Sequence, residues 1–140
     1  MKIGFACGVF DLFHLGHALM LKECKQHCDY LILALNNGEN FSNVVNPNKN
    51  LPIFSLHERI AILQSCRFVD EVITYSSEND LSNILSSRKI DIRFLGDDYK
   101  GKPITGSELN IEIHFIDRSH GFSTSNLIKK IMDRYKKNKI

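Results

Sequence analysis

The sequence predicts a single α/β domain, doubly wound around a five-stranded, mostly parallel sheet. Strand-like and helix-like segments alternate along the chain, and this pattern specifies a parallel sheet covered by helices on both faces. The length of 140 residues is that of one ordinary domain, here residues 1–140. With 43% hydrophobic and 24% charged residues, the composition is that of a soluble globular protein, and it excludes general disorder.

The first half of the chain predicts a βαβ unit followed by a long loop. Lys2–Cys7 forms the first strand and Leu15–His27 the helix after it. Tyr30–Asn36 is so uniformly apolar that we expect a central strand. Gly38–Phe54 contains many Asn residues, two Pro residues and no periodicity, so we interpret it as a loop belonging to a functional site.

The second half continues the alternation. Ser55 and Glu58 form a capping-box signature that opens a helix running to Cys66. The last helix, Ser123–Lys137, has one apolar face, and several Lys residues close its carboxyl end. Between these two helices we expect, in order, a strand at Val69–Tyr75, a short helix around residues 81–85, a strand at Ile90–Leu95, a glycine-rich loop at Gly96–Glu108 and a strand at Leu109–Ile116.

Charge and hydropathy exclude several classes of partner. Eighteen Lys and Arg residues against sixteen Asp and Glu residues give a net charge of +2, too balanced for a protein that mainly binds nucleic acid. The longest uninterrupted apolar run, Tyr30–Leu35, is far shorter than the roughly 20 residues that cross a bilayer, and the amino terminus lacks a signal-peptide core. We therefore expect a cytoplasmic protein with no nucleic-acid or membrane partner.

The four cysteines are expected to be free thiols. A domain of this size does not need disulfides, and no export signal accompanies them. Cys24, His27 and Cys28 raise the alternative of a metal site. However, Cys24 and Cys28 follow Ala18 and Leu21 at helical spacing, so both fall on an apolar stripe and core packing is favoured.

The most informative segment is GVFDLFHLGH at residues 8–17, where the first strand hands over to its helix. Ligands bind at the carboxyl ends of strands in such sheets. Gly8 allows a close backbone approach, Gly16 and His17 begin a helix with free N–H groups, and His14 lies three residues before His17. These features predict a phosphate site, although the glycine spacings and the Lys of the Walker and Rossmann motifs are absent.

This segment resembles the GxFDxxHxGH signature of the nucleotidyltransferase family that includes the cytidylyltransferases and several adenylyltransferases. Further motifs of that family follow in order along the chain: Arg59 in LHER, residues 67–72 as RFVDEV, residues 96–102 as GDDYKGK and residues 118–125 as RSHGFSTS. The third resembles the GDDWEGK of glycerol-3-phosphate cytidylyltransferases. GVFDLFH also resembles the corresponding run of phosphocholine cytidylyltransferases. Ser119 and His120 depart from the Thr and Glu of close relatives.

The resemblance implies CMP transfer from CTP to a small phosphorylated alcohol, with pyrophosphate released. A phosphate monoester is mostly ionised at neutral pH, so the reaction needs no general base. Catalysis would come from positioning and from donors that neutralise charge on the transferred group. We expect His14, His17 and Arg118 to be catalytic, with the two imidazoles and the start of the last helix converging on one polyanion.

The remaining site residues are assigned to the nucleotide or the acceptor. The nucleotide-binding set is Gly8, Val9, Phe10, Asp11, Gly16, Gly96, Asp97, Asp98, Ser123, Thr124 and Ser125. Lys49, Arg59 and Arg67 are expected to bind substrate phosphate. Asp11 has the alternatives of capping the turn, holding Mg²⁺ or orienting a histidine. Asp97 and Asp98 could simply form a turn, Ser123 could simply cap its helix, and Lys49 could be a solvated surface residue.

The identity of the acceptor and the choice between CTP and ATP as donor stay open. Glycerol 3-phosphate is the favoured acceptor, and phosphocholine or phosphoethanolamine is an alternative. The sequence has no Trp, and an aromatic cage that would bind choline is not evident. Transfer from ATP to a sugar phosphate or to FMN is a further alternative, and a non-catalytic nucleotide-binding module is the alternative from another class. We expect Mg²⁺ to accompany the triphosphate without a dedicated set of protein ligands. The resemblance also implies a homodimer.

Overall fold

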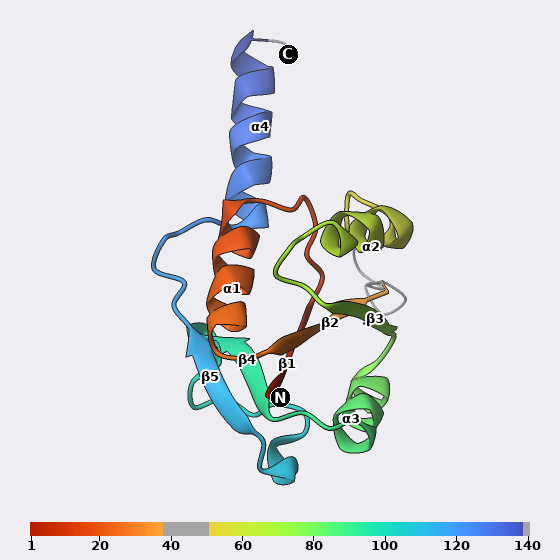
Figure 1. The fold of residues 1–140 in the computed structure, drawn as a ribbon. Coiled ribbons are helices and arrows are strands. Elements are labelled where there is room, and N and C mark those ends of the chain that lie inside the picture. The colour runs from red at the N-terminus through yellow and green to blue at the C-terminus, as the bar shows by residue number, and fades with distance from the viewer. Residues whose placement is uncertain (38–50, 139–140) are drawn as a thin grey trace.

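Five parallel strands form the sheet, in the order β3-β2-β1-β4-β5 (Figure 1). The computed structural model describes residues 1–37 and 51–138. Lys49 and most of the long loop expected at Gly38–Phe54 lie outside the described residues. The elements are β1 (Ile3–Gly8), α1 (Leu15–Gln26), β2 (Tyr30–Asn36), α2 (Leu56–Gln64), β3 (Glu71–Tyr75), α3 (Glu78–Ser87), β4 (Ile92–Gly96), the 3₁₀ turns η1 (Asp97–Tyr99) and η2 (Ser107–Leu109), β5 (Glu112–Ile116) and α4 (Thr124–Asn138).

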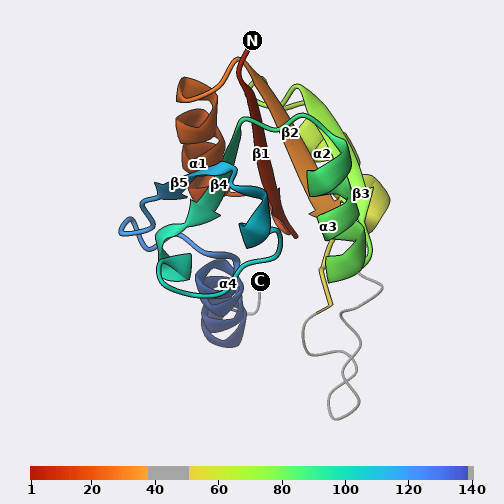
Figure 2. The same ribbon diagram turned by 90° about the horizontal axis from the view of Figure 1, so that it is seen from below.

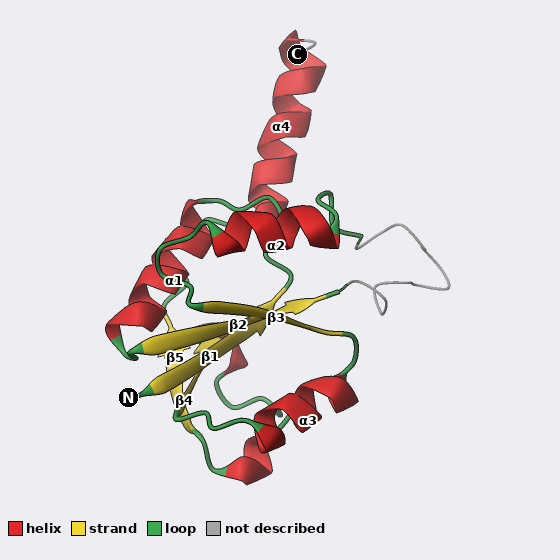
Figure 3. Cartoon of the chain, turned by 45° about the vertical axis from the view of Figure 1, so that its right-hand side comes forward, coloured by secondary structure: helices red, strands yellow, loops and turns green. Residues whose placement is uncertain are grey.

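Helices cover both faces of the sheet, as Figure 3 shows. On one face, Leu21 and Cys24 of α1 and Leu63 of α2 are buried in the same core cluster. On the opposite face, Leu81 and Leu85 of α3 are buried in a second cluster. The predicted doubly wound α/β fold with a five-stranded parallel sheet is therefore confirmed.

The sheet opens between β1 and β4. β1 pairs with β2 over six residues, from Ile3 to Gly8, but with β4 only at Gly4 and Phe5. Beyond Phe5 the two strands diverge toward their carboxyl ends, as Figure 2 shows. This is also where the strand order reverses direction, because β2 and β3 extend the sheet to one side of β1 while β4 and β5 extend it to the other. Ligands of such sheets bind at this switch point.

Three strands begin two or three residues later than predicted, and one of them is β4, which begins at Ile92 rather than Ile90. β3 begins at Glu71 rather than Val69, because the Val69 N–H donates back to the Cys66 carbonyl and closes a turn. β5 begins at Glu112 rather than Leu109, because Leu109 ends η2 and Asn110 adopts a left-handed conformation with φ of 55°. Periodicity identified all three strands, but the starts of β3 and β5 are set by local turns.

The cysteines are free thiols, and Cys24 of α1 is fully buried in the core. Burial raises the pKa of the Cys24 thiol. Within residues 1–37 and 51–138 no group of three His, Cys, Asp or Glu side chains is arranged to hold a metal ion. The helices of this described part are too short or too polar to span a bilayer.

Helix α4 projects away from the sheet (Figure 1). Its predicted apolar face is present, but most of that face is exposed to solvent. The exposed side chains are those of Ile128, Ile131, Met132 and Tyr135. Apolar residues gathered on one face in this way are a surface feature typical of interaction sites.

Candidate active site

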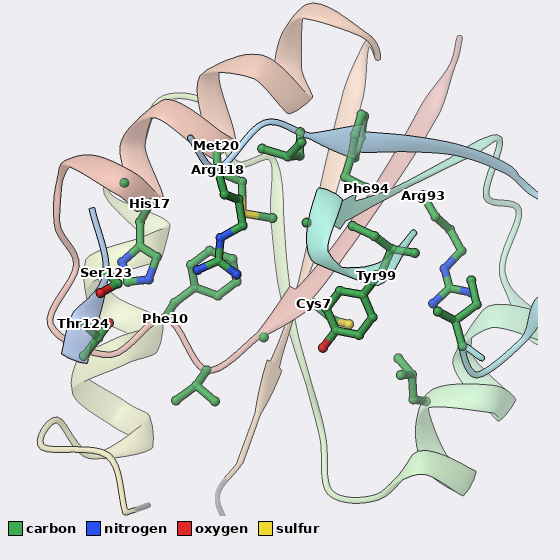
Figure 4. A pocket seen from close by; sticks show the side chains of 18 of the residues that line it. Cys7, Phe10, His17, Met20, Arg93, Phe94, Tyr99, Arg118, Ser123 and Thr124 are labelled. Atoms are coloured by element: carbon green, nitrogen blue, oxygen red, sulfur yellow. The ribbon is translucent and has the colours of Figure 1, made fainter. Parts of the chain in front are cut away.

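A cavity of about 600 Å³ lies where β1 and β4 diverge. Figure 4 shows its two ends. One end, which we call the histidine end, is lined by His14, His17, Arg118, Ser123 and Thr124. The other, which we call the Arg93 end, is lined by Cys7, Tyr75, Glu78, Arg93 and Thr105. Gly8, Val9, Gly96 and Tyr99, at the ends of β1 and β4, also line the cavity.

The two histidines cap the start of α1 reciprocally. Nδ1 of His14 accepts the N–H of Gly16 at 3.0 Å, and Nδ1 of His17 accepts the N–H of His14 at 3.3 Å. The pair thus satisfies two of the N–H groups that a helix leaves free at its start. Because each Nδ1 accepts, each neutral ring carries its hydrogen on Nε2. The Nε2–H of His17 is therefore available for other contacts, while that of His14 points to the hydroxyl of Thr124.

The surroundings keep these histidines neutral near pH 7. Burial lowers the pKa of His17 to about 4, with further lowering by His14 and Arg118. Burial also lowers the pKa of His14, with smaller effects from His120 and Arg118. An imidazole that stays neutral donates a hydrogen bond without bringing a proton that must be lost. The pair can therefore act as preorganised neutral donors.

The start of α4 meets the start of α1 at the histidine end. Nε2 of His14 lies 3.2 Å from the hydroxyl of Thr124, and that hydroxyl donates to the Asp11 carbonyl at 3.2 Å. The hydroxyl of Ser123 accepts the N–H of Asn126 and caps α4. Gly16 allows this approach, because a Cβ there would lie 2.9 Å from the Phe122 carbonyl oxygen. Two helix N-termini, each favourable to anions, are thereby brought together.

The loop between β1 and α1 is held in a strained conformation. Phe10 and Leu12 both have φ of 52°, in the left-handed region that non-glycine residues rarely occupy. Between them Asp11 is buried, with 7% of its surface exposed, and its carboxylate accepts the N–H groups of Ile53 and Phe54 at 2.7 and 2.9 Å. Strain of this kind persists where surrounding contacts over-determine the backbone, and it clusters at functional sites.

Arg59 also supports this loop. Its side chain is only 2% exposed, and Nη1 donates to the carbonyls of Val9 and Asn36 at 3.0 and 2.8 Å. Nε donates to the carbonyl of Phe54 at 3.2 Å. The guanidinium therefore joins the ends of β1 and β2 to the segment before α2. Its expected contact with substrate phosphate is a prediction that these backbone contacts do not favour.

Arg118 extends into the cavity from the loop after β5. Its side chain is 51% exposed, and Nη1 lies 3.6 Å from the carboxylate of Asp98. The backbone N–H of Arg118 donates to Asp97 at 3.4 Å. A Cβ at Gly96 would lie 2.9 Å from Cδ of Arg118, so glycine gives the arginine room to pass β4. Asp97 and Asp98 thus hold Arg118 at the rim, and neither lines the cavity.

The other predicted residues divide by position. Gly8, Val9, Phe10 and Gly16 line the cavity with the residues of the histidine end. Arg67 is exposed outside it, with its guanidinium 4.9 Å from the ring centre of Phe68. Ser125 is exposed at the first turn of α4 and does not line the cavity either. The roles assigned to Arg67 and Ser125 stay predictions.

The Arg93 end was not predicted from the sequence. Its residues come from β1, β3, α3, β4 and the loop after β4, so no contiguous motif identifies them. One signal was available: Arg93 interrupts a strand whose neighbours, Ile92 and Phe94, are buried and apolar. A cation within a buried strand is rare unless it has a partner or a function.

The carboxylates of Asp11, Asp97 and Asp98 already have partners within the protein. Both carboxylate oxygens of Asp11 accept backbone N–H groups, and the carboxylates of Asp97 and Asp98 face Arg118. Mg²⁺ prefers carboxylates that are free to coordinate, together with substrate phosphates and water. We therefore assign no step of the reaction to a metal held by these residues.

Comparison with known proteins identifies relatives of this chain. A family model described as cytidylyltransferase-like matches residues 5–130. The bifunctional protein HldE of Campylobacter jejuni strain RM1221 is 36% identical over 133 residues, which are 95% of this chain and 28% of that protein. HldE of Helicobacter hepaticus is 34% identical over 93% of the chain and 26% of that protein. The chain thus spans just over a quarter of the length of these curated relatives.

Solved structures with a similar fold were also found. A lipopolysaccharide core biosynthesis protein from Thermoplasma volcanium is 29% identical with a TM-score of 0.64, covering 84% of this chain and 95% of the other. Pantothenate synthetase from Thermus thermophilus shares the fold, with a TM-score of 0.60 at 11% identity over 91% of this chain and 61% of the other. With the family model matching residues 5–130, the chain belongs to the cytidylyltransferase-like family of nucleotidyltransferases.

Proposed function

We propose that this protein transfers a nucleoside monophosphate from a nucleoside triphosphate to a small phosphorylated acceptor. The observation that carries the proposal is the meeting of two helix N-termini at the paired imidazoles, where Nε2 of His14 lies 3.2 Å from Thr124. Two helix starts, two neutral imidazole donors and the cation of Arg118 form a site suited to a polyphosphate. The alternative of a non-catalytic module does not explain why strain is stored in the loop leading to His14.

The chemistry follows from this donor set. A phosphate oxygen of the acceptor attacks the α-phosphorus of the triphosphate. The bond between the α-phosphorus and the oxygen that bridges it to the β-phosphorus then breaks, and pyrophosphate leaves. The acceptor phosphate is already mostly ionised at pH 7, so no side chain has to remove a proton. His14 and His17 donate through Nε2–H to the triphosphate oxygens, while Arg118 offsets charge as it builds up. The starts of α1 and α4 hold the remaining phosphates.

The residues next to this end have supporting roles in the proposal. Ser123, Thr124 and Ser125 supply hydroxyl and N–H groups of α4 to the β- and γ-phosphates. Asp11 and Arg59 act as positioning residues, because their contacts fix the backbone that leads into His14.

The donor base and the acceptor are the finer part of the proposal. The GDDYKGK segment favours CTP as donor and glycerol 3-phosphate as acceptor. The relationship to a lipopolysaccharide core biosynthesis protein favours instead a phosphorylated sugar as acceptor. In both cases the acceptor is a phosphorylated polyol, and ATP is the second candidate donor.

We also propose that the protein is a homodimer, as its family resemblance implies. The exposed apolar face of α4 supports this assembly, because two copies of the same stripe can pair around a twofold axis. Pairing would remove Ile128, Ile131 and Met132 from water.

Pyrophosphate release tests the proposed reaction. Purified protein with Mg²⁺ is incubated with CTP or ATP and with glycerol 3-phosphate, a hexose 1-phosphate, phosphocholine or FMN. Release that requires both a nucleotide and an acceptor supports the proposal. Removing one preorganised donor in His17→Ala should lower kcat about 10²- to 10³-fold, whereas Lys89→Met, at an exposed position just after α3, should not change it. Tight nucleotide binding with no pyrophosphate from any acceptor would favour the non-catalytic module.

A further inference from the structure

Arg93 is a buried cation on the apolar face of the sheet beneath α3. It lies on β4, paired in register with Phe5 of β1, and only 3% of its surface is exposed. Leu85 of α3 packs nearby, because a Cβ at Gly106 would lie 2.8 Å from Cδ1 of Leu85 and 3.4 Å from Nη1 of Arg93. Arginine is almost never this deeply buried without a partner. We therefore expect a nearby group to compensate the buried positive charge of Arg93.

The protein supplies only part of that compensation. Nη1 of Arg93 donates to the Thr105 carbonyl at 2.6 Å. Within residues 1–37 and 51–138 the guanidinium makes no other hydrogen bond, and no carboxylate lies at ion-pair distance from it. Among the same residues, every side-chain nitrogen that is fully shielded from solvent has a hydrogen-bond partner. Because Arg93 lines the cavity, a ligand there can accept the remaining hydrogens of its guanidinium.

Glu78 and Thr105 add polar groups at this end of the cavity. The carboxylate of Glu78, at the first residue of α3, accepts the hydroxyl hydrogen of Thr105 through Oε2. Glu78 is exposed and lines the cavity, so its second oxygen is available to a ligand as an acceptor. The Arg93 end thus offers guanidinium donors and a carboxylate acceptor, linked to each other through Thr105.

The charges at the two ends of the cavity differ. Arg118 gives the histidine end a cation beside two helix N-termini, which suits phosphates. At the Arg93 end the carboxylate of Glu78 and the guanidinium of Arg93 both contact Thr105, so the negative charge of Glu78 offsets that of Arg93. This balance disfavours a second anionic group, because Glu78 would repel it. It also disfavours a quaternary or primary amine, because Arg93 would repel that.

We propose that Arg93 and Glu78 bind hydroxyl groups of the acceptor. A hydroxyl both accepts and donates, so it can accept from Arg93 while donating to Glu78. This inference rests on the proposed function and deepens it: the acceptor is a phosphorylated polyol or sugar, its phosphate at the histidine end and its hydroxyl-bearing end at Arg93. Figure 4 shows Arg93 and Arg118 at opposite sides of the cavity, with Cys7 and Tyr99 between them.

Paired acceptors test the assignment. For each variant, the specificity ratio is kcat/KM for a hexose 1-phosphate or glycerol 3-phosphate divided by kcat/KM for methyl phosphate, which has no hydroxyl. Removing a hydrogen bond to a charged group costs about 1.5–3 kcal/mol, or about 10- to 150-fold. Arg93→Met and Glu78→Gln should each lower the ratio by at least 10-fold, mainly by raising KM for the polyol phosphate. The control Lys89→Met, which removes an exposed cation, should leave the ratio unchanged.

The outcomes separate the two proposals. Unchanged ratios in Glu78→Gln, whose exposed position avoids any effect on the core, would overturn the hydroxyl assignment while leaving the transfer reaction intact. Preference of the unmodified protein for phosphocholine or for 3-phosphoglycerate would overturn it as well. If no acceptor is turned over, the proposed function fails, and calorimetry decides the subsite. Binding of the hexose 1-phosphate that weakens at least 10-fold in Glu78→Gln supports it, and absence of binding overturns it.

Discussion

The imidazole rings of His14 and His17 are stacked, with their centroids 3.8 Å apart, and Nδ1 of His17 accepts the backbone N–H of His14. The same nitrogen in each ring caps the helix, so the opposite nitrogen is the one that faces the site. The two histidines therefore stabilise the helix start through Nδ1 and donate to ligand through Nε2. These two functions can be separated by mutation.

His14→Asn should separate capping from catalysis. Asparagine is a strong N-cap residue, so it should keep the free energy of unfolding within about 0.5 kcal/mol of the original protein. It lacks the Nε2 donor, so kcat should fall about 10²- to 10³-fold. His14→Ala should show the same loss of kcat together with about 1 kcal/mol of destabilisation. Urea unfolding and pyrophosphate release measure the two effects, and an active His14→Asn would contradict the catalytic assignment.

Stability should fall as the pH is lowered from 7 toward 4. The pKa of His17 is about 4 in the folded protein and near 6.5 in the unfolded chain. Between these values the unfolded chain binds a proton that the folded protein does not, so acid favours unfolding, by at most about 1.4 kcal/mol per pH unit for one group. Urea titrations at several pH values measure this slope. His17→Asn should reduce the slope, and an unchanged slope would show that His17 does not titrate as described.

Asp11→Ala should destabilise the protein and impair the site. Both carboxylate oxygens accept backbone N–H groups in a buried position, and leaving such donors unsatisfied costs about 1–3 kcal/mol. The loss should also loosen the strained backbone between Phe10 and Leu12, so kcat should fall with stability. Asp133→Asn on the exposed surface of α4 is the matched control. Wild-type stability in Asp11→Ala would show that these two bonds do not hold the loop.

Ile131→Glu should convert the proposed homodimer to a monomer. Ile131 is 54% exposed on the apolar face of α4, so a charge there would be tolerated in a monomer but buried in a paired interface. Light scattering coupled to size exclusion measures the mass of both proteins. Lys130→Glu, on the polar side of the same helix, is the control. A monomeric unmodified protein would contradict the proposal directly.

Much of the fold follows from local patterns. The run Leu31–Leu35 is buried at every position, as its uninterrupted apolarity predicts for a strand covered on both faces. The signals at Ser55 and Glu58 correspond to an observed capping box. By contrast, the starts of β3 and β5 depend on hydrogen bonds and a left-handed residue in the preceding turns, which hydrophobic periodicity does not report.

For the site, the sequence by itself determined the histidine end, because its residues belong to two short motifs at the starts of α1 and α4. Only the tertiary structure decided that Arg59 contacts the backbone carbonyls of Val9 and Asn36, and that Arg93, Glu78 and Thr105 share one cavity. The physical reason is that local sequence governs a turn and a helix start, whereas burial and charge balance depend on which distant segments the sheet brings together. β4 contributes Arg93 to the cavity because the register and divergence of β1 and β4 open the sheet there.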